Sequence, residues 1–546
     1  YFDTEGKVLG VWVNGELFPA APTNAVKAVK TNAVAATTPA PTAEAKKPDL
    51  RKLAAVRQAR DPLSDRTVPA PPPSVLITNA TIWTCGPLGV LTNASLMVNR
   101  GILGVGRFTA SWDRSGTQQQ VTGPAAFFGN DIRTAMFSLP DENTQVINGT
   151  GLHVTPGLVD THSHSMILGG VNEPTLPSTA MVRVGDVINS ESPTIHQQLA
   201  GGLTVANLLH GSANPIGGQS QVIKLRDGAS PEGLRFTNAP AGIKFALGEN
   251  VKQANWGDQF TTRFPQTRMG VPTFFRNRFT AARRYQEAWN RWNTQKTGAP
   301  PRRDLELEAL VEILDGRRRI HCHSYRQDEI LVFLRTMEEF GIRVGTLQHV
   351  LEGYKVADEI ARHGAGASAF ADWWGYKFEV IDAIPYAGSL MRERGVNVSF
   401  NSDSDDLARR LNLEAAKAVK YGGTPEADAL LFVTLNPAVQ LGIDRWVGSL
   451  EPGKDADFVI WSGHPLDSGS RCLQTWIEGR LYFDRSREPE RVRALAAERT
   501  ALVDKARQLA GSGSPATPGS AARDQFFRRA LETARQEKFI GAPLEA

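Results

Sequence analysis

The sequence lacks the features that mark disulfide-stabilised, membrane-spanning and nucleic-acid-binding proteins. Only three cysteines occur among 546 residues, and since Cys85, Cys322 and Cys472 are odd in number and far apart, no disulfide framework is predicted. No apolar run approaches the ~18 residues that a membrane-spanning helix requires. Lysine and arginine number 61 against 57 acidic residues, a net charge of +4, which gives no reason to expect nucleic acid or an anionic membrane as a partner.

The bulk composition is that of a large globular protein. Apolar residues make up 41% and charged residues 22% of the chain, both ordinary values for a folded, soluble protein. A length of 546 residues exceeds that of a typical single domain, so we expect several domains or one large barrel with additions. The compartment stays open. The expectation is a soluble, bacterial-type protein of the cytoplasm or periplasm after processing, since the numbering begins at Tyr1.

The two ends of the chain differ in texture from its middle. Residues 1–19 have a strand-turn-strand pattern and are interpreted as the remnant of an upstream domain. Residues 20–73 are rich in alanine, threonine, proline and lysine, a composition that buries little apolar surface and predicts an extended linker. Residues 486–546 are highly charged and predict a helical tail that wraps the surface or a neighbouring subunit.

Two groups of short strands flank the middle of the chain. Alternating β-branched and apolar residues, bounded by turn residues, predict strands within residues 74–153 and again within residues 445–485. We expect these two segments to complete each other as one small, composite β-sandwich.

Residues 154–444 alternate between strand-like and helix-like patterns. A short apolar or β-branched run is followed by a loop and then by a stretch with helical spacing, and this unit recurs along the segment. Such alternation favours a parallel sheet, and this many units favour a closed barrel. The predicted fold class is therefore α/β, a (β/α)8 TIM-like barrel with the β-sandwich attached.

Polar side chains recur where the predicted strands give way to loops. His162 and His164 end an apolar run that begins at Leu158, and residues two apart on a strand project from the same face. The other residues at such boundaries are Lys244, His321, His323, His349 and Asp403. Catalytic loops gather at the carboxyl end of a barrel, so we expect these side chains to meet there. Two neutral imidazoles with a nearby acid form part of the ligand set of a catalytic divalent metal.

Several motifs stand in a recognisable order between residues 74 and 484. The first is Pro156–His164, which follows the predicted β-sandwich strands. Single histidines on later strands come next, and the series ends with Asn401-Ser402-Asp403, Asn436-Pro437-Ala438, Gly448-Ser449-Leu450 and Gly453–Phe458. As an ordered set they resemble the metal-dependent amidohydrolase superfamily, and they look closest to its imidazolonepropionase-like and prolidase-like members. The resemblance implies a barrel metalloenzyme.

The resemblance also implies a set of metal ligands. By similarity, His162 and His164 would bind the first metal, and Asp403 would complete its shell. His349, with a histidine of the preceding strand, would bind a second metal or polarise the substrate. The expected metal is zinc, as one ion or two, with iron or manganese as alternatives.

Two positions in that set have alternatives. On the strand before His349, His321 fits the strand length better and His323 fits the spacing to the next helix better. We favour His321 slightly and keep His323 as a ligand or a substrate contact. Lys244 resembles the carboxylated lysine that bridges two metals at the end of the fourth strand, and Glu249 is the alternative bridging carboxylate.

Hydrolysis is the chemistry that such a site supports. A bound divalent cation lowers the pKa of a water toward ~7. Asp403 is placed to take a proton from that water and deliver it to the leaving nitrogen, and His349 or the metal would stabilise the oxyanion. Candidates for substrate contacts are His210, Tyr325, Arg326, Tyr354 and Lys355. The aromatic run at residues 372–377 either walls a pocket or forms an oligomer contact.

We therefore expect a metal-dependent hydrolase of amide or other C–N bonds, in peptide or non-peptide substrates. A deaminase of an aminoheterocycle is the nearest alternative, followed by a phosphotriesterase-like hydrolase and by a non-catalytic scaffold with the same fold. The expected partners are a small-molecule or peptide-like substrate and further copies of the chain in a homo-oligomer, with no nucleic acid and no membrane.

Overall fold

The computed structural model of the protein describes residues 10–13, 16–19, 68–70, 74–99, 102–106, 109–112, 118–122, 144–252, 263–371, 373 and 375–511. The chain separates into two units, residues 1–61 and 62–546. In the first unit, β1 (Gly10–Val13) and β2 (Glu16–Pro19) pair as an antiparallel hairpin, in agreement with the strand-turn-strand pattern. Most of the predicted linker, and the tail beyond residue 511, lie outside the described residues.

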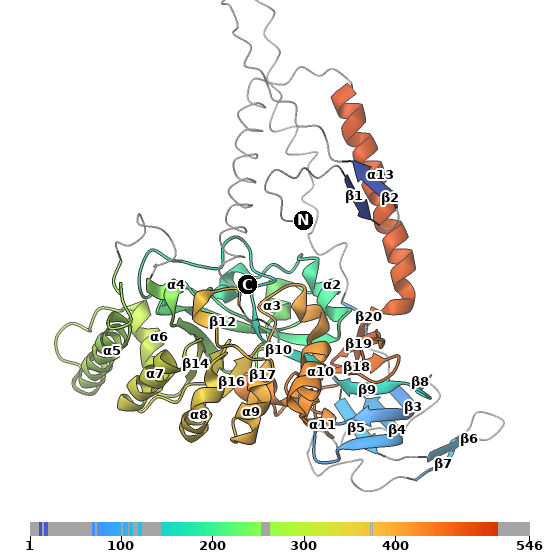
Figure 1. Ribbon diagram of the computed structural model, residues 1–546, viewed down its shortest axis with the longest axis horizontal. Coiled ribbons are helices and arrows are strands. Elements are labelled where there is room, and N and C mark those ends of the chain that lie inside the picture. Colours follow the sequence, from blue (N-terminus) through green and yellow to red (C-terminus); the bar gives the residue numbers. More distant parts are fainter. Residues whose placement is uncertain are drawn as a thin grey trace, which may run out of the picture. The chain divides into compact units, whose positions relative to one another are not determined.

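The second unit contains the predicted barrel as an eight-stranded sheet (Figure 1). In spatial order, which is also chain order, its strands are β10 (Leu158–Ser163), β11 (Leu203–Leu208), β12 (Ile216–Lys224), β13 (Ala241–Ala246), β14 (Arg318–His323), β15 (Thr346–Gln348), β16 (Gly366–Ala369) and β17 (Val398–Phe400). Most of their residues are buried, as expected for strands that helices cover on one side and barrel-interior side chains on the other.

The third strand departs from the parallel arrangement that the alternating pattern predicted. β12 runs antiparallel to both β11 and β13, whereas the remaining paired neighbours of the barrel are parallel. Only residues 209–215 connect β11 to β12, too few for the crossover helix that a parallel return requires. The chain therefore turns back directly.

Helices and 3-10 turns fill the connections between the other strands. They are η3 (Val184–Val187), α2 (Thr194–Leu199), α3 (Pro231–Leu234), α4 (Glu249–Lys252), α5 (Gly270–Gln295), α6 (Leu305–Leu314), α7 (Gln327–Glu339), η5 (Gly353–Val356), α8 (Ala357–His363), η6 (Phe378–Val380), α9 (Ala387–Glu393), η7 (Leu407–Arg410), α10 (Leu411–Gly422), α11 (Glu426–Leu431) and α12 (Leu435–Leu441). Local chemistry sets their ends. Asp304, for example, caps α6 by accepting hydrogen bonds from the backbone amides of Glu306 and Leu307.

The predicted β domain is a second sheet, assembled from both flanks of the barrel. Its order is β20 (Arg480–Asp484), β19 (Cys472–Ile477), β18 (Phe458–Trp461), β9 (His153–Pro156), β3 (Ser74–Trp83), β4 (Val90–Asn99) and β5 (Ile102–Gly106), with β8 (Thr144–Asn148) also paired to β3. These strands form one continuous hydrogen-bonded sheet around its own apolar core, which includes Ile77, Leu96, Phe458 and Trp476. β6 (Thr109–Trp112) and β7 (Gln118–Thr122) form a separate hairpin, which the sequence pattern did not indicate.

A buried lysine joins the barrel to the β domain. Lys224, the last residue of β12, is fully buried, and its Nζ lies 2.9 Å from Asp455 Oδ2, 3.0 Å from Asp457 Oδ2 and 3.2 Å from Glu478 Oε1. Arg226 adds a 2.6 Å ion pair to the same glutamate. Burial of a charge is tolerated only where partners compensate it, so these contacts tie β12 to the segments around β18 and β19.

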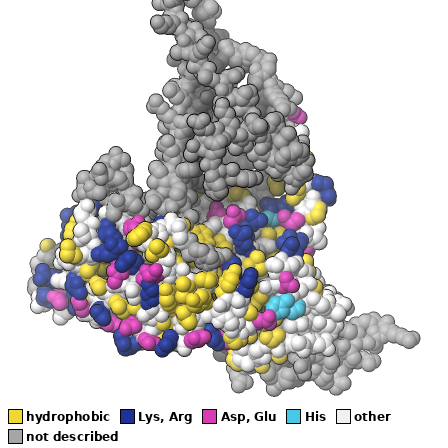
Figure 2. Space-filling view, in the orientation of Figure 1, with side chains coloured by type: hydrophobic (Ala, Val, Ile, Leu, Met, Phe, Trp, Pro, Cys, Tyr) yellow, Lys and Arg dark blue, Asp and Glu magenta, His cyan; other side chains and the backbone are white. Residues whose placement is uncertain are grey.

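Two of the described helices are long, and neither is apolar enough to cross a membrane. α5 extends over 26 residues, and α13 (Glu488–Gly511) extends over 24. No helix among the described residues is long and apolar enough to cross a membrane. Basic and acidic side chains are interspersed over the face seen in Figure 2, in keeping with the small net charge.

Candidate metal centre

Three predicted ligands converge where the first and last barrel strands meet. His162 lies near the end of β10, His164 follows that strand, and Asp403 follows β17. The Nε2 atoms of the two histidines are 3.1 Å apart, and Asp403 Oδ1 lies 3.5 Å from His162 Nε2 and 3.3 Å from His164 Nε2. Among the described residues these three form the group whose potential ligand atoms all lie within 4.8 Å of one another.

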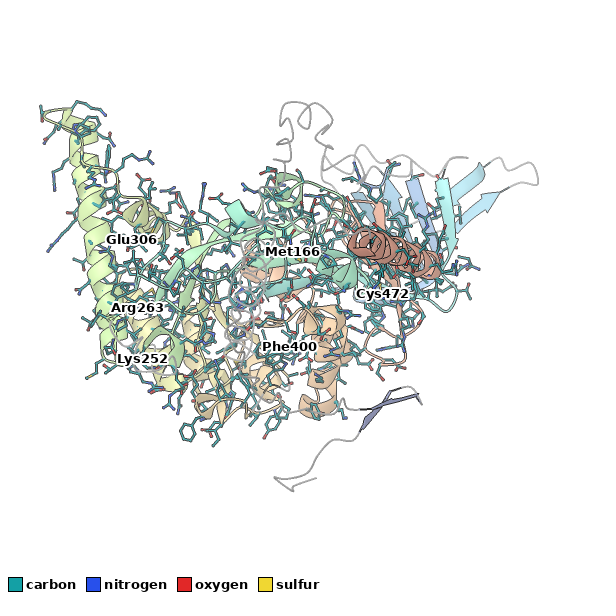
Figure 3. The ribbon with its side chains drawn as sticks, turned by 90° about the horizontal axis from the view of Figure 1, so that it is seen from above. Met166, Lys252, Arg263, Glu306, Phe400 and Cys472 are labelled. Carbon is teal, nitrogen blue, oxygen red and sulfur yellow. The ribbon has the colours of Figure 1, made fainter. Side chains whose placement is uncertain are left out.

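Asp160 holds the two strand ends together beneath this group. Its Oδ1 accepts hydrogen bonds from the backbone amides of His162 and Ser402, both at 3.1 Å, and its Oδ2 accepts one from the Ser402 hydroxyl at 2.5 Å. The Asp403 amide in turn donates to the His162 carbonyl oxygen at 3.1 Å. In Figure 3, Met166, two residues beyond His164, and Phe400, the last residue of β17, mark this central region of the barrel.

The ring of His162 is neutral, and a hydrogen bond orients the ring of His164. Burial, followed by the charge of Lys244 and the neighbouring imidazoles, lowers the pKa of His162 well below its ordinary value, so its ring is neutral at physiological pH. His164 Nδ1 lies 2.9 Å from the Leu209 carbonyl oxygen. Because a carbonyl can only accept, this contact assigns the proton to Nδ1 and leaves the Nε2 lone pair of His164 for a ligand.

Two residues of the centre have left-handed backbone conformations. His349, directly after β15, has φ 54°, and Asp403 has φ 45°. Residues other than glycine seldom adopt this region, and such strain is concentrated at functional sites. The two side chains meet, with His349 Nε2 3.4 Å from Asp403 Oδ2. Burial, followed by the charges of His323 and Lys244, lowers the pKa of His349 well below its ordinary value.

Lys244 points from β13 into the same group. It is fully buried, and its Nζ lies 3.1 Å from His162 Nε2. The predicted position at the end of the fourth barrel strand is thus adjacent to the histidine pair.

Of the two histidines on β14, the structure brings His323 to His349. The two ring centroids are 5.2 Å apart, and the Tyr325 ring lies 4.3 Å from that of His323. His321 pairs in register with Lys244 and lies against Gly242, where an added Cβ would meet its ring at 3.1 Å. Burial and the charge of Arg319 lower the pKa of His321 to about 3. His323 stands two residues closer than His321 to the carboxyl end of the strand and lies beside His349, and the choice between them as a ligand stays a prediction.

The alternative bridging residue lies elsewhere. Glu249 is the first residue of α4, and its backbone amide donates to Glu379 Oε2 at 3.1 Å. Its carboxylate is not part of the three-residue ligand group found among the described residues. Lys244, which touches His162, is the better candidate for the bridging position.

The predicted substrate contacts divide into two kinds. His210 Nε2 accepts a hydrogen bond from the Glu173 amide at 2.8 Å, and its Nδ1 lies 2.9 Å from the Gly211 carbonyl oxygen. Both ring nitrogens thus serve backbone groups, and we do not propose His210 as a substrate contact. Tyr325, in contrast, is buried beside His323, and its ring centroid lies 6.2 Å from that of His349.

The remaining three candidates hold loops of the protein itself. Arg326 Nε lies 3.0 Å from Asp328 Oδ1 near the start of α7. The Tyr354 hydroxyl donates to the Asp382 carbonyl oxygen at 3.0 Å, and Lys355 Nζ lies 2.5 Å from Asp382 Oδ2. These contacts fit loop-holding roles, and no contact of these three side chains with the ligand group is seen in the described part of the chain.

Two features of the centre were not predicted. One is Asp160, whose position as an acidic residue directly after the apolar pair Leu158-Val159 was the available signal. The other is the packing of Phe370 on His349, with ring centroids 4.8 Å apart and planes inclined by 16°. Phe370 directly follows β16 and carries no polar signature.

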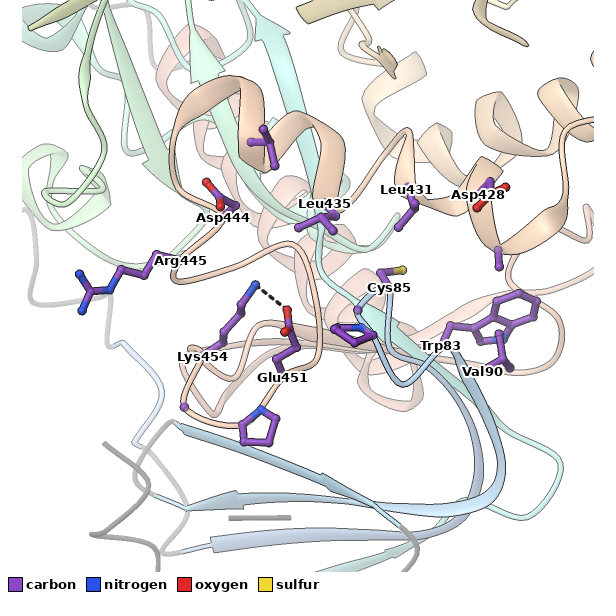
Figure 4. A pocket seen from close by; sticks show the side chains of 17 residues that line it. Trp83, Cys85, Val90, Asp428, Leu431, Leu435, Asp444, Arg445, Glu451 and Lys454 are labelled. Carbon is purple, nitrogen blue, oxygen red and sulfur yellow. Dashed lines mark ion pairs between the residues drawn. The ribbon is translucent and has the colours of Figure 1, made fainter. Parts of the chain in front are cut away.

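A large cavity lies away from this centre. It has a volume of about 860 Å³ and lies between the β domain and the helices α11 and α12, with Trp83, Leu431, Leu435, Glu451 and Lys454 among its lining residues (Figure 4). None of the predicted ligands lines it. Cavity size alone would thus direct attention away from the histidine cluster.

Comparison with known proteins agrees with the fold and the motif order. The model of the amidohydrolase family matches residues 306–482. The amidohydrolase tasK of Hapsidospora irregularis is 33% identical over 373 residues, which are 63% of this chain and 38% of that protein. The imidazolonepropionase of Thermoplasma volcanium is 35% identical over 119 residues, 20% of this chain and 29% of that protein. The chain thus spans well under half the length of these two curated relatives.

A solved structure extends the similarity over most of the chain. The crystal structure of an amidohydrolase from Thermotoga maritima MSB8 superposes with a TM-score of 0.64 and 29% sequence identity, covering 75% of this chain and 100% of that one. The barrel, the β domain built from both flanks and the ordered motifs agree with these similarities, and the chain is thus similar to amidohydrolases over most of its length.

Proposed function

We propose that the protein is a metal-dependent hydrolase that cleaves an amide or another C–N bond. The observation that carries this proposal is the convergence of His162, His164 and Asp403 within 4.8 Å at the ends of the first and last barrel strands. Similarity to amidohydrolases supports a hydrolase of C–N bonds. The kind of bond, the metal and the mechanism are our inferences from this chain's own residues.

The donor set fits a divalent cation. Two neutral imidazoles and a carboxylate are the ligands that zinc prefers in catalytic sites, with iron and manganese also compatible. His162 Nδ1 is buried and has no hydrogen-bond partner among the described residues, so the polar contacts of this ring are made through Nε2. A cation held here would supply a water of lowered pKa and polarise a carbonyl group.

Asp403 is the proposed proton carrier. Its carboxylate takes a proton from the attacking water and delivers it to the leaving nitrogen, as a general base and then a general acid. His349, 3.4 Å from Asp403 Oδ2, orients that carboxylate. His349 would also stabilise the developing oxyanion or, together with His323, bind a second ion.

We propose that Lys244 acts in its carboxylated form. An unmodified ammonium 3.1 Å from His162 Nε2 would donate to the lone pair that a metal needs, and its positive charge would repel a cation. Addition of carbon dioxide to the neutral amine, with loss of one proton, converts the group into an anionic carbamate. The modified side chain would then add an oxygen ligand beside the histidines.

Metal analysis combined with a substrate panel tests the proposal. Purified protein and the His162→Ala variant are assayed for bound zinc, iron and manganese, with His464→Ala, remote from the centre, as the matched control. The panel contains N-acyl amino acids, dipeptides, lactams and aminoheterocycles. We expect bound metal in the wild type and the control, metal loss in His162→Ala, and amide or lactam cleavage.

Other outcomes would change the assignment. Ammonia release from an aminoheterocycle without ring or peptide cleavage would favour a deaminase. A metal-free wild type whose stability equals that of His162→Ala would favour the non-catalytic scaffold.

A further inference from the structure

A second pocket lies where the barrel meets the β domain. Its volume of about 420 Å³ falls within the range of roughly 300–1,000 Å³ that small-molecule sites occupy. Its walls come from α2, η7, the start of α10, the loop between β18 and β19, β20 and the first residue of α13. Cys472, labelled in Figure 3, is among the lining residues. None of the proposed metal ligands lines this pocket, so it is separate from the candidate centre.

Positive charge exceeds negative charge in the wall of this pocket, which we call the arginine pocket. Two acidic residues line it, Asp406 and Glu488. Glu488 Oε1 lies 2.8 Å from His196 Nε2, so this carboxylate has a partner outside the pocket wall. Asp406 Oδ1 lies 3.4 Å from Arg409 Nη1, and solvent screens this pair because the two side chains are 77% and 48% exposed. Four arginines oppose the two acids: Arg409, Arg410, Arg471 and Arg485.

Two of the arginines are held in place by backbone carbonyl groups. Arg485 Nε donates to the Cys472 carbonyl oxygen at 2.5 Å, and its Nη2 donates to that of Ala200 at 3.2 Å. Arg471 Nη1 donates to the Ser468 carbonyl oxygen at 3.0 Å, within its own loop. These carbonyl groups orient the two guanidinium groups without neutralising their charge. Since a guanidinium group has five N–H donors, each of the two keeps donors for a ligand.

Arg410 has no such anchor. Its side chain is exposed, and within the described part of the chain it makes neither an ion pair nor a hydrogen bond. Ser468 and Ser470 line the same pocket, and their hydroxyl groups are further possible donors. An anion placed among these groups would be attracted by several positive charges at once. The arginine pocket therefore favours an anionic ligand.

We propose that the arginine pocket binds a soluble small molecule that carries a phosphate group. The planar guanidinium group presents paired N–H donors that match the oxygens of a phosphate. A phosphate monoester has three free oxygens and nearly two negative charges at neutral pH, so it can engage several arginines together. A carboxylate, with two oxygens and one charge, engages fewer of them. The inference does not depend on the hydrolase proposal, because no residue of the candidate centre takes part in it.

Calorimetry with phenyl phosphate and benzoate tests the proposal, since the two probes share a ring and differ in the anionic group. The protein is first treated with a chelator, so that no metal binds either anion. We expect wild type to bind phenyl phosphate more tightly than benzoate. The double variant Arg410→Gln, Arg471→Gln should weaken phenyl phosphate binding by about tenfold or more, the size of a lost hydrogen bond to a charged group.

A matched double variant controls for the loss of overall charge. Arg284→Gln, Arg291→Gln removes the same charge from exposed positions of α5, which does not line the pocket, and should bind as wild type does. Thermal unfolding of both double variants checks the fold. Should the pocket variant unfold, Arg410→Gln alone tests the site, because this side chain holds no other described residue in place. Lysine at both pocket positions keeps the charge but not the paired donors, so its loss should be smaller.

Two further measurements separate the possible kinds of binding. Raising NaCl from about 50 to about 300 mM should weaken phenyl phosphate binding, because salt screens the arginines. Sedimentation with phosphatidylcholine vesicles that contain one-fifth phosphatidic acid distinguishes a lipid headgroup from a soluble phosphate, and we expect no more bound protein than with phosphatidylcholine alone. The inference would be overturned by no binding of phenyl phosphate, by equal affinity in wild type and the pocket variant, or by an equal loss in the α5 variant. Benzoate binding as tight as that of phenyl phosphate, or vesicle binding that the pocket variant loses, would also overturn it.

Discussion

The Asp160 carboxylate accepts a hydrogen bond from the backbone amide of Ser402, across a separation of 242 residues in the chain. The bond joins β10, the strand that carries His162, to the loop after β17, which carries Asp403. Asp160 touches no proposed substrate position. Asp160 matters because it fixes the distance between His162 and Asp403, which come from the first and the last strand of the barrel sheet.

Asp160→Asn should therefore weaken metal binding without removing a ligand. Asparagine retains an oxygen acceptor for the two backbone amides, but its NH2 group cannot accept from the Ser402 hydroxyl as Oδ2 does. Loss of a partner that orients metal ligands typically lowers metal affinity by about 10- to 100-fold. Competition with a fluorescent zinc chelator measures the change, and Asp186→Asn, at an exposed ion pair with Arg183, is the control. Equal zinc affinity in Asp160→Asn and wild type would contradict the positioning role.

Asp403→Asn should separate proton transfer from folding. The substitution keeps the size of the side chain but removes the group proposed to carry the proton, so we expect kcat to fall by about 10²- to 10⁴-fold at saturating metal. Asp405→Asn, two residues away and exposed, should retain wild-type kcat. Thermal unfolding of both variants checks the fold. A kcat for Asp403→Asn within threefold of wild type would exclude this residue as the general base.

Carbon dioxide should affect metal loading if Lys244 is carboxylated. In buffer freed of carbon dioxide, we expect the chelator-treated protein to bind zinc more weakly than in buffer with added bicarbonate, because the unmodified ammonium repels the cation. Lys244→Ala should abolish the bicarbonate effect, whereas Lys252→Ala, a substitution of a lysine on α4 that contacts Glu329, should keep it. A zinc affinity that is independent of bicarbonate in the wild type would argue for an unmodified lysine.

Lys224→Met should destabilise the whole second unit. The substitution leaves the carboxylates of Asp455 and Asp457 without their buried cation, and removal of one partner of a buried ion pair costs about 3–5 kcal/mol. Arg276→Met breaks an exposed pair with Glu339, which water and salt screen, so a much smaller loss is expected. Urea unfolding followed by tryptophan fluorescence measures both. Similar losses for the two variants would show that the Lys224 cluster adds no more than a surface pair.

Sequence reasoning predicted which side chains meet at the candidate centre because two strong regularities coincide there. The period of two along a strand placed His162 and His164 on one face, and the convergence of strand ends in a barrel brought Lys244, His349 and Asp403 to the same place. Both regularities depend on residue spacing alone. They therefore survive errors of one or two residues in the predicted ends of strands.

Sequence reasoning missed features that depend on the three-dimensional arrangement of the strands and not on residue spacing. His321 and His323 share a face, so their spacing could not decide which one reaches His349. The direction of β12 depended on a connection too short for a helix, within a segment rich in glycine and small residues. The stack of Phe370 on His349 joins two strands through an apolar ring, and no local pattern marks such a contact.

Glu478 should make stability depend on pH in acid. Burial raises the pKa of this carboxyl group, but the hydrogen bond from Arg226 and the charges of Lys224 and Arg226 outweigh it and lower the pKa from 4.5 to about 2. A carboxyl group whose pKa is lower in the folded state stabilises the protein when ionised. This contribution is fully present above the unfolded-state pKa near 4.5 and is lost as the pH falls toward 2. Glu478→Gln lacks the titrating group, so the difference in unfolding free energy between wild type and variant should shrink steadily from pH 6 to pH 3.5. Asp457, whose pKa is raised to about 6 by burial and to a smaller extent by the charge of Glu478, titrates in the same range, so both proteins are compared in an Asp457→Asn background. A difference that stays constant or grows over this range would mean that Arg226 and Lys224 do not hold Glu478 in its ionised form.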